Sequence, residues 1–228
     1  MIKKLTWDSD FFELNVGEVI FKKEKLLNNY TFDLIYIKSN SDFELNISNY
    51  INTLSETKIL YSKKLNANSN SNSNVNLKIQ SFLETNYDIE DLYLLAFESG
   101  KFSRFKLDEN IKNVKFEALY KKWIDNSVSL EFATDILLYQ INNQTIGFLS
   151  YKIYNNFVNV GLFSVLPNHQ GKGVGKCLLN QLESILANKN IHEIQIPTQL
   201  ENIAACHFYD KVGYKIKETT YLKHYWKK

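Results

Sequence analysis

Hydrophobic and polar positions divide the chain into segments of two different periods. Short apolar runs between polar residues predict strands, and apolar residues spaced three or four apart predict helices. The predicted strands cover residues 34–37, 58–61, 93–97, 136–141, 144–154, 157–165, 194–196 and 214–226. The predicted helices cover residues 43–54, 116–124, 174–188 and 202–212. The chain is therefore expected to adopt an α/β fold, mixed in its first half and ordered β-β-β-α-β-α-β in its second.

Turn and cap residues support the elements of the second half. Asn142 and Asn143 lie between two apolar runs and predict a hairpin turn. Asn202 is placed to cap the helix 202–212, and Gly213 is placed to end it. The clearest apolar stripe lies on the helix 174–188 and consists of Val174, Cys177, Leu178, Leu182, Ile185 and Leu186.

One segment follows neither period. Residues 66–76 are almost entirely Asn and Ser, which have little to bury, so they predict a flexible surface loop. Such an insertion is tolerated because long loops cost little extra closure entropy. We expect two units in the chain: an N-terminal α/β domain over residues 1–104, which carries this loop, and a second domain over residues 105–228.

Composition excludes several classes of protein. The 228 residues are 44% hydrophobic, which suits a folded core, and no apolar run is long enough to span a bilayer. The first residues contain no signal-peptide core, so we expect a cytoplasmic protein without membrane insertion. A net charge of +2 with no long basic run argues against nucleic-acid binding. Two cysteines form no disulfide framework, and no Cys/His spacing suits zinc, so no metal is expected.

The basic residues single out one position. The chain has 26 Lys and one Arg, which is Arg104. Since Lys supplies charge everywhere else, position 104 is a candidate for a role that needs a guanidinium, which can hold two oxygens of a phosphate or carboxylate in one plane. The alternative is an ordinary surface salt bridge.

A glycine-rich turn joins the strand 157–165 to the helix 174–188. Its sequence is Gln170, Gly171, Lys172, Gly173, Val174, Gly175 and Lys176. Free N–H groups at the start of a helix, together with the helix dipole, favour an anion there. The spacing fits neither a P-loop nor a dinucleotide GxGxxG motif. It does fit Gln-x-x-Gly-x-Gly, and the alternative is a turn without a ligand.

Two signatures make the chain resemble the GNAT superfamily of N-acetyltransferases. The first is this Gln-x-x-Gly-x-Gly turn, which resembles the family's pyrophosphate motif for acyl-CoA. The second is residues 202–214, which resemble the family's Asn-x-x-Ala…Phe/Leu-Tyr-x-x-x-Gly-Phe/Tyr pattern. The resemblance implies a mixed, mostly antiparallel central sheet flanked by helices, with acetyl-CoA as cosubstrate, and it covers about residues 105–228.

Two further segments resemble one branch of that superfamily, the dTDP-fucosamine acetyltransferases. These are residues 5–12, which include Trp7 and Asp8, and residues 99–108, which include Ser103 and Arg104. The resemblance implies a dTDP-linked 4-amino-4,6-dideoxyhexose as the acceptor and makes these four residues candidates for binding it. For Trp7 the alternative is ordinary core packing. A homodimer is left open.

The resemblance also implies roles for residues of the reaction. Backbone groups of Phe163 and Val165 are expected to face the pantetheine and the thioester carbonyl. Tyr209 occupies the position of the family's general acid, which protonates the leaving thiolate. Its alternative is core packing, and Asn202 is expected either to contact CoA or only to cap its helix.

The general base cannot be assigned from the sequence. His207, His224 and Asp8 are candidates, and water alone would suffice for a sugar amine. A cysteine nucleophile is not expected, because Cys177 and Cys206 lie on helices and Cys177 belongs to the buried stripe. Two rival functions stay open: a GNAT enzyme that acetylates another amine, such as a peptide N-terminus, an antibiotic or another amino sugar, and a non-catalytic acyl-CoA-binding protein.

Overall fold

The computed structural model of the protein describes residues 2–21, 31–65, 78–187, 189 and 191–228. Its strands are β1 (Lys3–Lys4), β2 (Val16–Ile20), β3 (Leu34–Ser39), β4 (Tyr50–Lys64), β5 (Ile79–Ser81), β6 (Asp135–Ile141), β7 (Gln144–Ile153), β8 (Phe157–Val165), β9 (Glu193–Gln199) and β10 (Lys215–Lys227). Its helices are α1 (Thr6–Phe12), α2 (Ile89–Gly100), α3 (Arg104–Leu107), α4 (Asn113–Val128), α5 (Val174–Ala187) and α6 (Ile203–Lys211), with a 3₁₀ turn at Pro167–His169. No helix of these ranges has the length and apolar character needed to cross a membrane.

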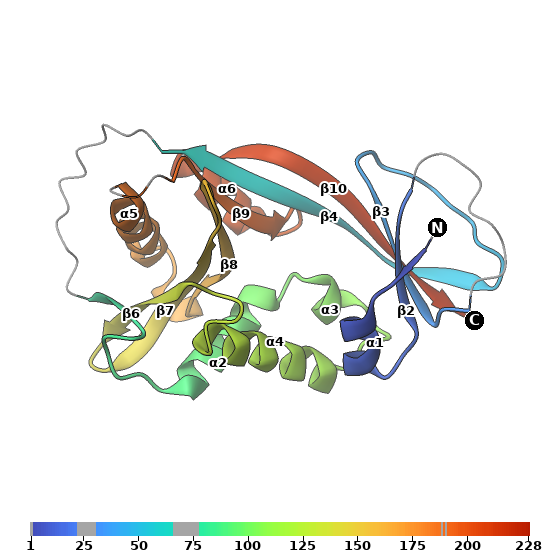
Figure 1. Ribbon diagram of the computed structural model, residues 1–228, viewed down its shortest axis with the longest axis horizontal. Coiled ribbons are helices and arrows are strands. Elements are labelled where there is room, and N and C mark those ends of the chain that lie inside the picture. The colour runs from blue at the N-terminus through green and yellow to red at the C-terminus, as the bar shows by residue number, and fades with distance from the viewer. Residues whose placement is uncertain (1, 22–30, 66–77, 188, 190) are drawn as a thin grey trace.

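The described strands form one sheet in the order β1-β2-β3-β10-β4-β9-β8-β7-β6-β5 (Figure 1). The pairs β2–β3 and β8–β9 are parallel and the remaining neighbours are antiparallel, so the sheet is mixed and mostly antiparallel, as predicted. The long strand β10 lies between β3 and β4. Strands from both sides of residue 104 thus share one sheet, and the division into two domains stays a prediction.

Helices cover both faces of the sheet, because side chains of a strand alternate between its faces. On β6, Leu137 and Tyr139 pack in a core with α5 and α6, whereas Ile136 and Leu138 pack in a second core with α2 and α4. Figure 1 shows α2, α3 and α4 together on one side of the sheet. Each fully buried aliphatic side chain of these cores stabilises the fold by about 1.5–3 kcal/mol.

Most of the predicted elements are confirmed. The hairpin turn is formed by Asn142 and Asn143 with φ angles of 51° and 64°, the left-handed conformation that suits a two-residue turn. The predicted strands 34–37 and 58–61 lie within β3 and β4, and the helix 202–212 is α6 with Asn202 as its cap. The predicted Asn/Ser loop lies outside the described residues.

The predicted helix 43–54 is wrong. Residues 41–49 contain no helix, and β4 begins at Tyr50. Phe43, Ile47 and Tyr50 are buried together against β3 and β10, so their apolar spacing reflects a packed loop rather than a helical face. Asn49 adopts the left-handed conformation at φ 64°, which ends the loop and turns the chain into the strand.

The predicted strand 93–97 is also wrong, since these residues belong to α2. Asp88 begins this helix, its carboxylate accepting the backbone N–H of Glu90 at 3.0 Å. Leu92, Leu95 and Ala96 form the buried face at helical spacing. A short apolar run suits a strand or a buried helix equally well, and here the cap decides the outcome.

Candidate functional site

A cleft opens in the sheet where β8 and β9 separate. The two strands pair only from Phe157↔Glu193 to Asn159↔Gln195; beyond that point β9 continues on β4 and β8 continues on β7. The register gives residues 160–165 of β8 no partner on the side that faces β9. The Val165 carbonyl accepts a hydrogen bond from the Gln170 side chain at 2.8 Å. The other backbone N–H and C=O groups on that side have no strand partner and can bind an extended ligand.

A bulge in β8 marks the point of separation. Leu149 of β7 pairs with Phe163 and Tyr151 pairs with Val160, so β8 has one extra residue between these pairs. Ser150 stabilises the bulge, its hydroxyl accepting the backbone N–H of Leu162 at 2.8 Å. An extra residue of this kind bends its strand, which carries β8 away from β9.

The glycine turn lies directly after β8, at the start of α5. Gly171 and Gly173 have φ angles of +73° and +85°, which favour glycine, and a Cβ at either position would meet nothing within 4 Å. Open space therefore borders the first N–H groups of α5, as an anion site at a helix start requires. The Gln170 side chain is used internally, donating to the Val165 carbonyl at 2.8 Å and to Glu98 Oε1 at 3.0 Å.

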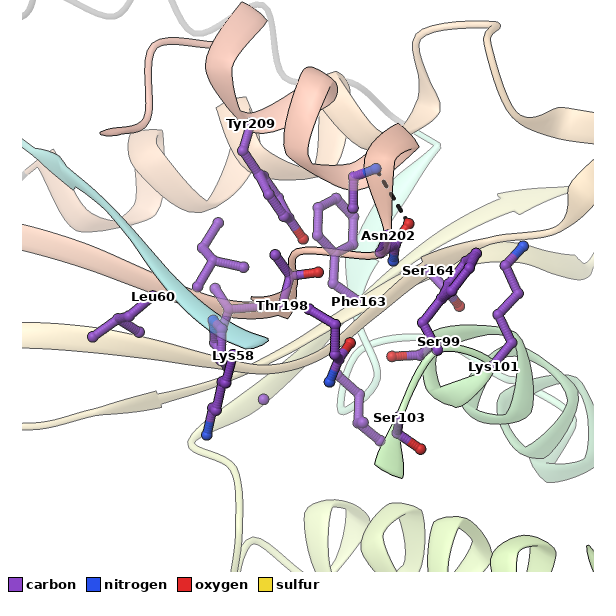
Figure 2. Close-up of a pocket in the computed structure, with 18 of the residues that line it drawn as sticks. Lys58, Leu60, Ser99, Lys101, Ser103, Phe163, Ser164, Thr198, Asn202 and Tyr209 are labelled. Atoms are coloured by element: carbon purple, nitrogen blue, oxygen red, sulfur yellow. Dashed lines mark hydrogen bonds between the residues drawn. The ribbon is translucent and has the colours of Figure 1, made fainter. Parts of the chain in front are cut away.

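One cavity of about 1370 Å³ extends from this turn, through the cleft, to the helices α1 and α3. Apart from Lys172, which is exposed and does not line it, the predicted site residues all do. They are Trp7, Asp8, Ser103, Arg104, Phe163, Val165, Gln170, Gly171, Gly173, Val174, Gly175, Lys176, Asn202 and Tyr209. Figure 2 shows Ser103, Phe163, Asn202 and Tyr209 around this space. The structure thus brings together side chains that lie far apart in the sequence.

Tyr209 extends from α6 into the pocket, with its hydroxyl end toward Thr198 (Figure 2). The residue is only 5% exposed, and its ring lies 5.3 Å from the ring of Tyr61 and 6.4 Å from that of Phe163. Burial raises the pKa of its phenol, so the hydroxyl stays protonated at neutral pH and is able to donate. Core packing and a reactive hydroxyl are thus compatible at this position.

Asn202 caps its helix as predicted, and its contact with CoA stays a prediction. Its side-chain oxygen accepts the backbone N–H of Ala205 at 3.3 Å, which caps α6. The residue also lines the cavity beside Tyr209.

At the other end of the cavity, Arg104 makes no ion pair with any carboxylate of the described residues. Its guanidinium carbon lies 3.9 Å from the ring centre of Tyr36 and 4.2 Å from that of Phe105. One N–H donates to Nε2 of His224, with 3.1 Å between the nitrogens. His224 is fully buried, and Nδ1 of its ring lies 2.5 Å from Oδ2 of Asp108.

The candidates for the general base differ in placement. Both ring nitrogens of His224 have partners, and burial lowers its pKa to about 4, so it is neutral and not available as a base. His207 and Asp8 line the cavity, and burial raises the pKa of the Asp8 carboxyl. Cys177 and Cys206 do not line it, and burial raises the pKa of the Cys206 thiol.

Sequence reasoning missed two groups of residues at the end of the cavity near α1 and α3. Glu56 and Lys58 line the cavity from β4, and Glu56 Oε2 is buried without a hydrogen-bond partner among the described residues. Burial raises the pKa of this carboxyl. Alternation along a strand would have placed positions 56, 58 and 60 on one face, but the strand was predicted only from residue 58. Tyr36, which lies against Arg104, and Asp108, which bonds His224 beside it, have no local signal in the sequence.

Comparison with known proteins identifies relatives for this arrangement. Residues 87–214 match the model of the acetyltransferase (GNAT) family, which is more than half of the chain. The chain is 24% identical to the spore coat polysaccharide biosynthesis protein SpsD of Bacillus subtilis, over 61% of this chain and 48% of SpsD, about half of that relative. It is 28% identical to the spermidine N(1)-acetyltransferase of Thermoplasma acidophilum, over 58% of this chain and 85% of that protein.

The fold has solved counterparts. An acetyltransferase from the GNAT family of Colwellia psychrerythraea superposes with a TM-score of 0.51, at 11% identity, over 85% of this chain and 65% of that one. At this identity the likeness concerns the fold alone.

Proposed function

Because the chain belongs to the GNAT family of acetyltransferases, whose cosubstrate is acetyl-CoA, we propose that it acetylates the amino group of a dTDP-linked 4-amino-4,6-dideoxyhexose. The reaction serves surface polysaccharide synthesis in the cytoplasm. Support for the sugar comes from the segments around Trp7 and Arg104 and from the name of the relative SpsD. The alternative acceptor is another amine, for which the spermidine acetyltransferase is the nearest example among the relatives described above.

The observation that carries this proposal is the continuity of the cavity. A single space joins the glycine turn, where a pyrophosphate would bind, to an arginine whose guanidinium forms no ion pair with a carboxylate of the described residues. Both substrates then fit in one ternary complex, and the amine attacks the thioester directly. Neither cysteine lines the space, so an acyl-cysteine intermediate has no support.

In this complex, the acetyl-CoA end of the cavity acts through its backbone. The first N–H groups of α5 bind the pyrophosphate, and the free groups of β8 at Phe163 and Val165 bind the pantetheine and the thioester carbonyl. The amine lone pair forms the new C–N bond, and the C–S bond breaks with its electrons on sulfur. Tyr209 gives its proton to that sulfur and regains one from solvent.

At the acceptor end, side chains provide recognition. Trp7 is 43% exposed at the cavity wall and stacks on Phe11 with ring centres 5.2 Å apart, which gives a flat surface for the thymine base. Arg104 and Ser103 lie toward the diphosphate and the sugar. The amine loses its proton to water, Asp8 or His207, the last two of which line the cavity.

The proposal is tested by steady-state assays with acetyl-CoA and a panel of acceptors. The panel holds dTDP-4-amino-4,6-dideoxygalactose, its glucose epimer, spermidine and a short peptide. We expect the highest kcat/KM for a dTDP-amino sugar. A higher kcat/KM for spermidine or the peptide would contradict the proposed acceptor, and no thioester turnover with any amine would favour the non-catalytic alternative.

A further inference from the structure

A buried chain of hydrogen bonds runs from Asp108 to Arg104. Oδ2 of Asp108 accepts the indole N–H of Trp226 at 2.9 Å and faces Nδ1 of His224 at 2.5 Å, while Oδ1 accepts the Thr53 hydroxyl at 3.2 Å. Nε2 of His224 then faces Nη1 of Arg104 at 3.1 Å. Asp108 and His224 are 1% and 0% exposed, so water does not compete for these bonds.

The donors and acceptors along this chain fix the state of the imidazole. A guanidinium only donates, so Nε2 of His224 must present its lone pair to Arg104. The ring proton is therefore on Nδ1 and is donated to Asp108. Asp108 acts only as an acceptor toward His224, Trp226 and Thr53, as a carboxylate does. Burial acts to raise the pKa of Asp108, but the hydrogen bonds from His224 and Trp226 lower it, in agreement with an ionised group.

These contacts fix the position of Arg104 but use only part of its N–H donors. Its guanidinium carbon lies over the rings of Tyr36 and Phe105, and one N–H donates to His224. A neutral imidazole holds the guanidinium without cancelling its charge, as a directly bound carboxylate would. Arg104 lines the cavity, so its remaining N–H groups are available to a planar pair of oxygens.

We propose that Asp108 and His224 are positioning residues that hold Arg104 ready to bind a phosphate group of the acceptor. This inference rests on the proposed nucleotide-sugar function. His224 itself touches no reacting atom, and its effect passes through Arg104. Neither Asp108 nor His224 lines the cavity, which agrees with an indirect role.

Two substitutions of His224 separate its two hydrogen bonds. H224N keeps an N–H close to the position of Nδ1, toward Asp108, but removes the acceptor for Arg104. H224Q reaches the position of Nε2 and keeps an acceptor there, but loses the bond to Asp108. Both replace the imidazole ring by a carboxamide, so each is the matched control for the other. Thermal unfolding is measured on both variants to check that they fold.

The primary measurement is the binding of dTDP, by calorimetry, to the full chain. A hydrogen bond to a charged group contributes about 1.5–3 kcal/mol, so we expect H224N to weaken dTDP binding by roughly tenfold or more. H224Q is expected to recover part of this loss, the remainder being the effect of the lost bond to Asp108, and the affinity for acetyl-CoA is expected to stay unchanged in both. Equal losses in the two variants, or a parallel loss of acetyl-CoA affinity, would show a merely structural role.

A double-mutant cycle with R104K tests whether His224 acts through Arg104. If it does, R104K/H224N binds dTDP about as weakly as R104K alone, because the second change removes nothing further. Additive losses would overturn the inference. So would a wild-type protein that does not bind dTDP.

The same readout separates this inference from the proposed function. If wild type binds dTDP and the cycle is non-additive, but no dTDP-amino sugar is acetylated, the proposed acceptor is wrong and the positioning role stands. If a dTDP-amino sugar is acetylated while the two His224 variants match wild type in dTDP binding and acceptor KM, the function stands and the positioning role is wrong.

Discussion

The two ends of the cavity are built in different ways. The acetyl-CoA end is made mainly of backbone: the separated stretch 160–165 and the glycine turn before α5, all within a short length of chain. The acceptor end is made of side chains from α1, β4 and α3, and the residue that holds Arg104 lies 120 positions away in β10. A backbone site depends on local conformation, whereas a side-chain site depends on how distant elements pack.

The largest effect is expected where the backbone site is broken. Gly173→Asp places a negative charge beside the N–H groups of α5, and we expect acetyl-CoA binding to be lost while dTDP binding is kept. Gly173→Asn is the matched control, since Asn has the same size and tolerates a positive φ without adding charge. Calorimetry with acetyl-CoA measures both. Unchanged affinity in the Asp variant would show that no pyrophosphate binds at the turn.

Tyr209 lies where the two ends meet and is expected to affect turnover rather than binding. Tyr209→Phe removes the proton donor, so kcat should fall by roughly 10²-fold with little change in the KM for acetyl-CoA. Tyr61→Phe makes the same change on the neighbouring ring, which does not line the cavity, and should leave kcat nearly unchanged. A kcat for Tyr209→Phe within about twofold of wild type would exclude it as the acid.

Arg104→Lys tests the acceptor end alone. An ammonium keeps the charge but loses the planar fork, so the KM for the dTDP-amino sugar should rise by roughly tenfold, with that for acetyl-CoA nearly unchanged. Lys106→Gln, on the exposed side of the same helix, controls for a general charge effect. Equal KM values for Arg104→Lys and wild type would leave Arg104 without a role in acceptor binding.

The acceptor end should also give the protein a pH-dependent stability. His224 has a pKa of about 4 when folded and about 6.5 when unfolded, so the unfolded chain binds more protons between these values. The stability that the neutral His224 contributes is fully present above pH 6.5 and is lost as the pH falls toward 4. The free energy of unfolding is expected to be lower by about 2 kcal/mol at pH 5. Urea unfolding at pH 7 and pH 5 measures this loss. H224Q should lose less over the same interval, and identical losses in the two proteins would contradict this account.

The smallest effect is expected from the Asn/Ser segment. Deleting most of residues 66–76 should leave the affinity for both substrates and the melting temperature nearly unchanged, because their side chains have little to pack. A large fall in turnover or in melting temperature would give the segment a structural or substrate-binding role.

The same contrast explains how far the sequence could be interpreted. The glycine turn and α6 were predicted because each is a short continuous segment of the sequence. Gly173 belongs to one such segment, and Asn202 and Tyr209 belong to the other. Because residues 43–54 were predicted as a helix, the first part of β4 was not recognised as a strand. Glu56, which lies in that part of β4, was therefore not placed at the cavity. Composition pointed to Arg104, but nothing local could show that His224 lies beside it. That contact exists only because β10 pairs with β3 and β4.

The place of β10 between β3 and β4 also bears on how the protein folds as it is synthesised. Ser39 of β3 pairs with Tyr221, and Lys58 of β4 pairs with Thr220. Both strands therefore pair with a strand that is synthesised much later. Until residues 215–227 emerge, β3 and β4 each keep an open edge able to pair with another chain. Closing such distant contacts is slow, so the completion of this sheet is the step at which a chaperone would protect the nascent protein from aggregation.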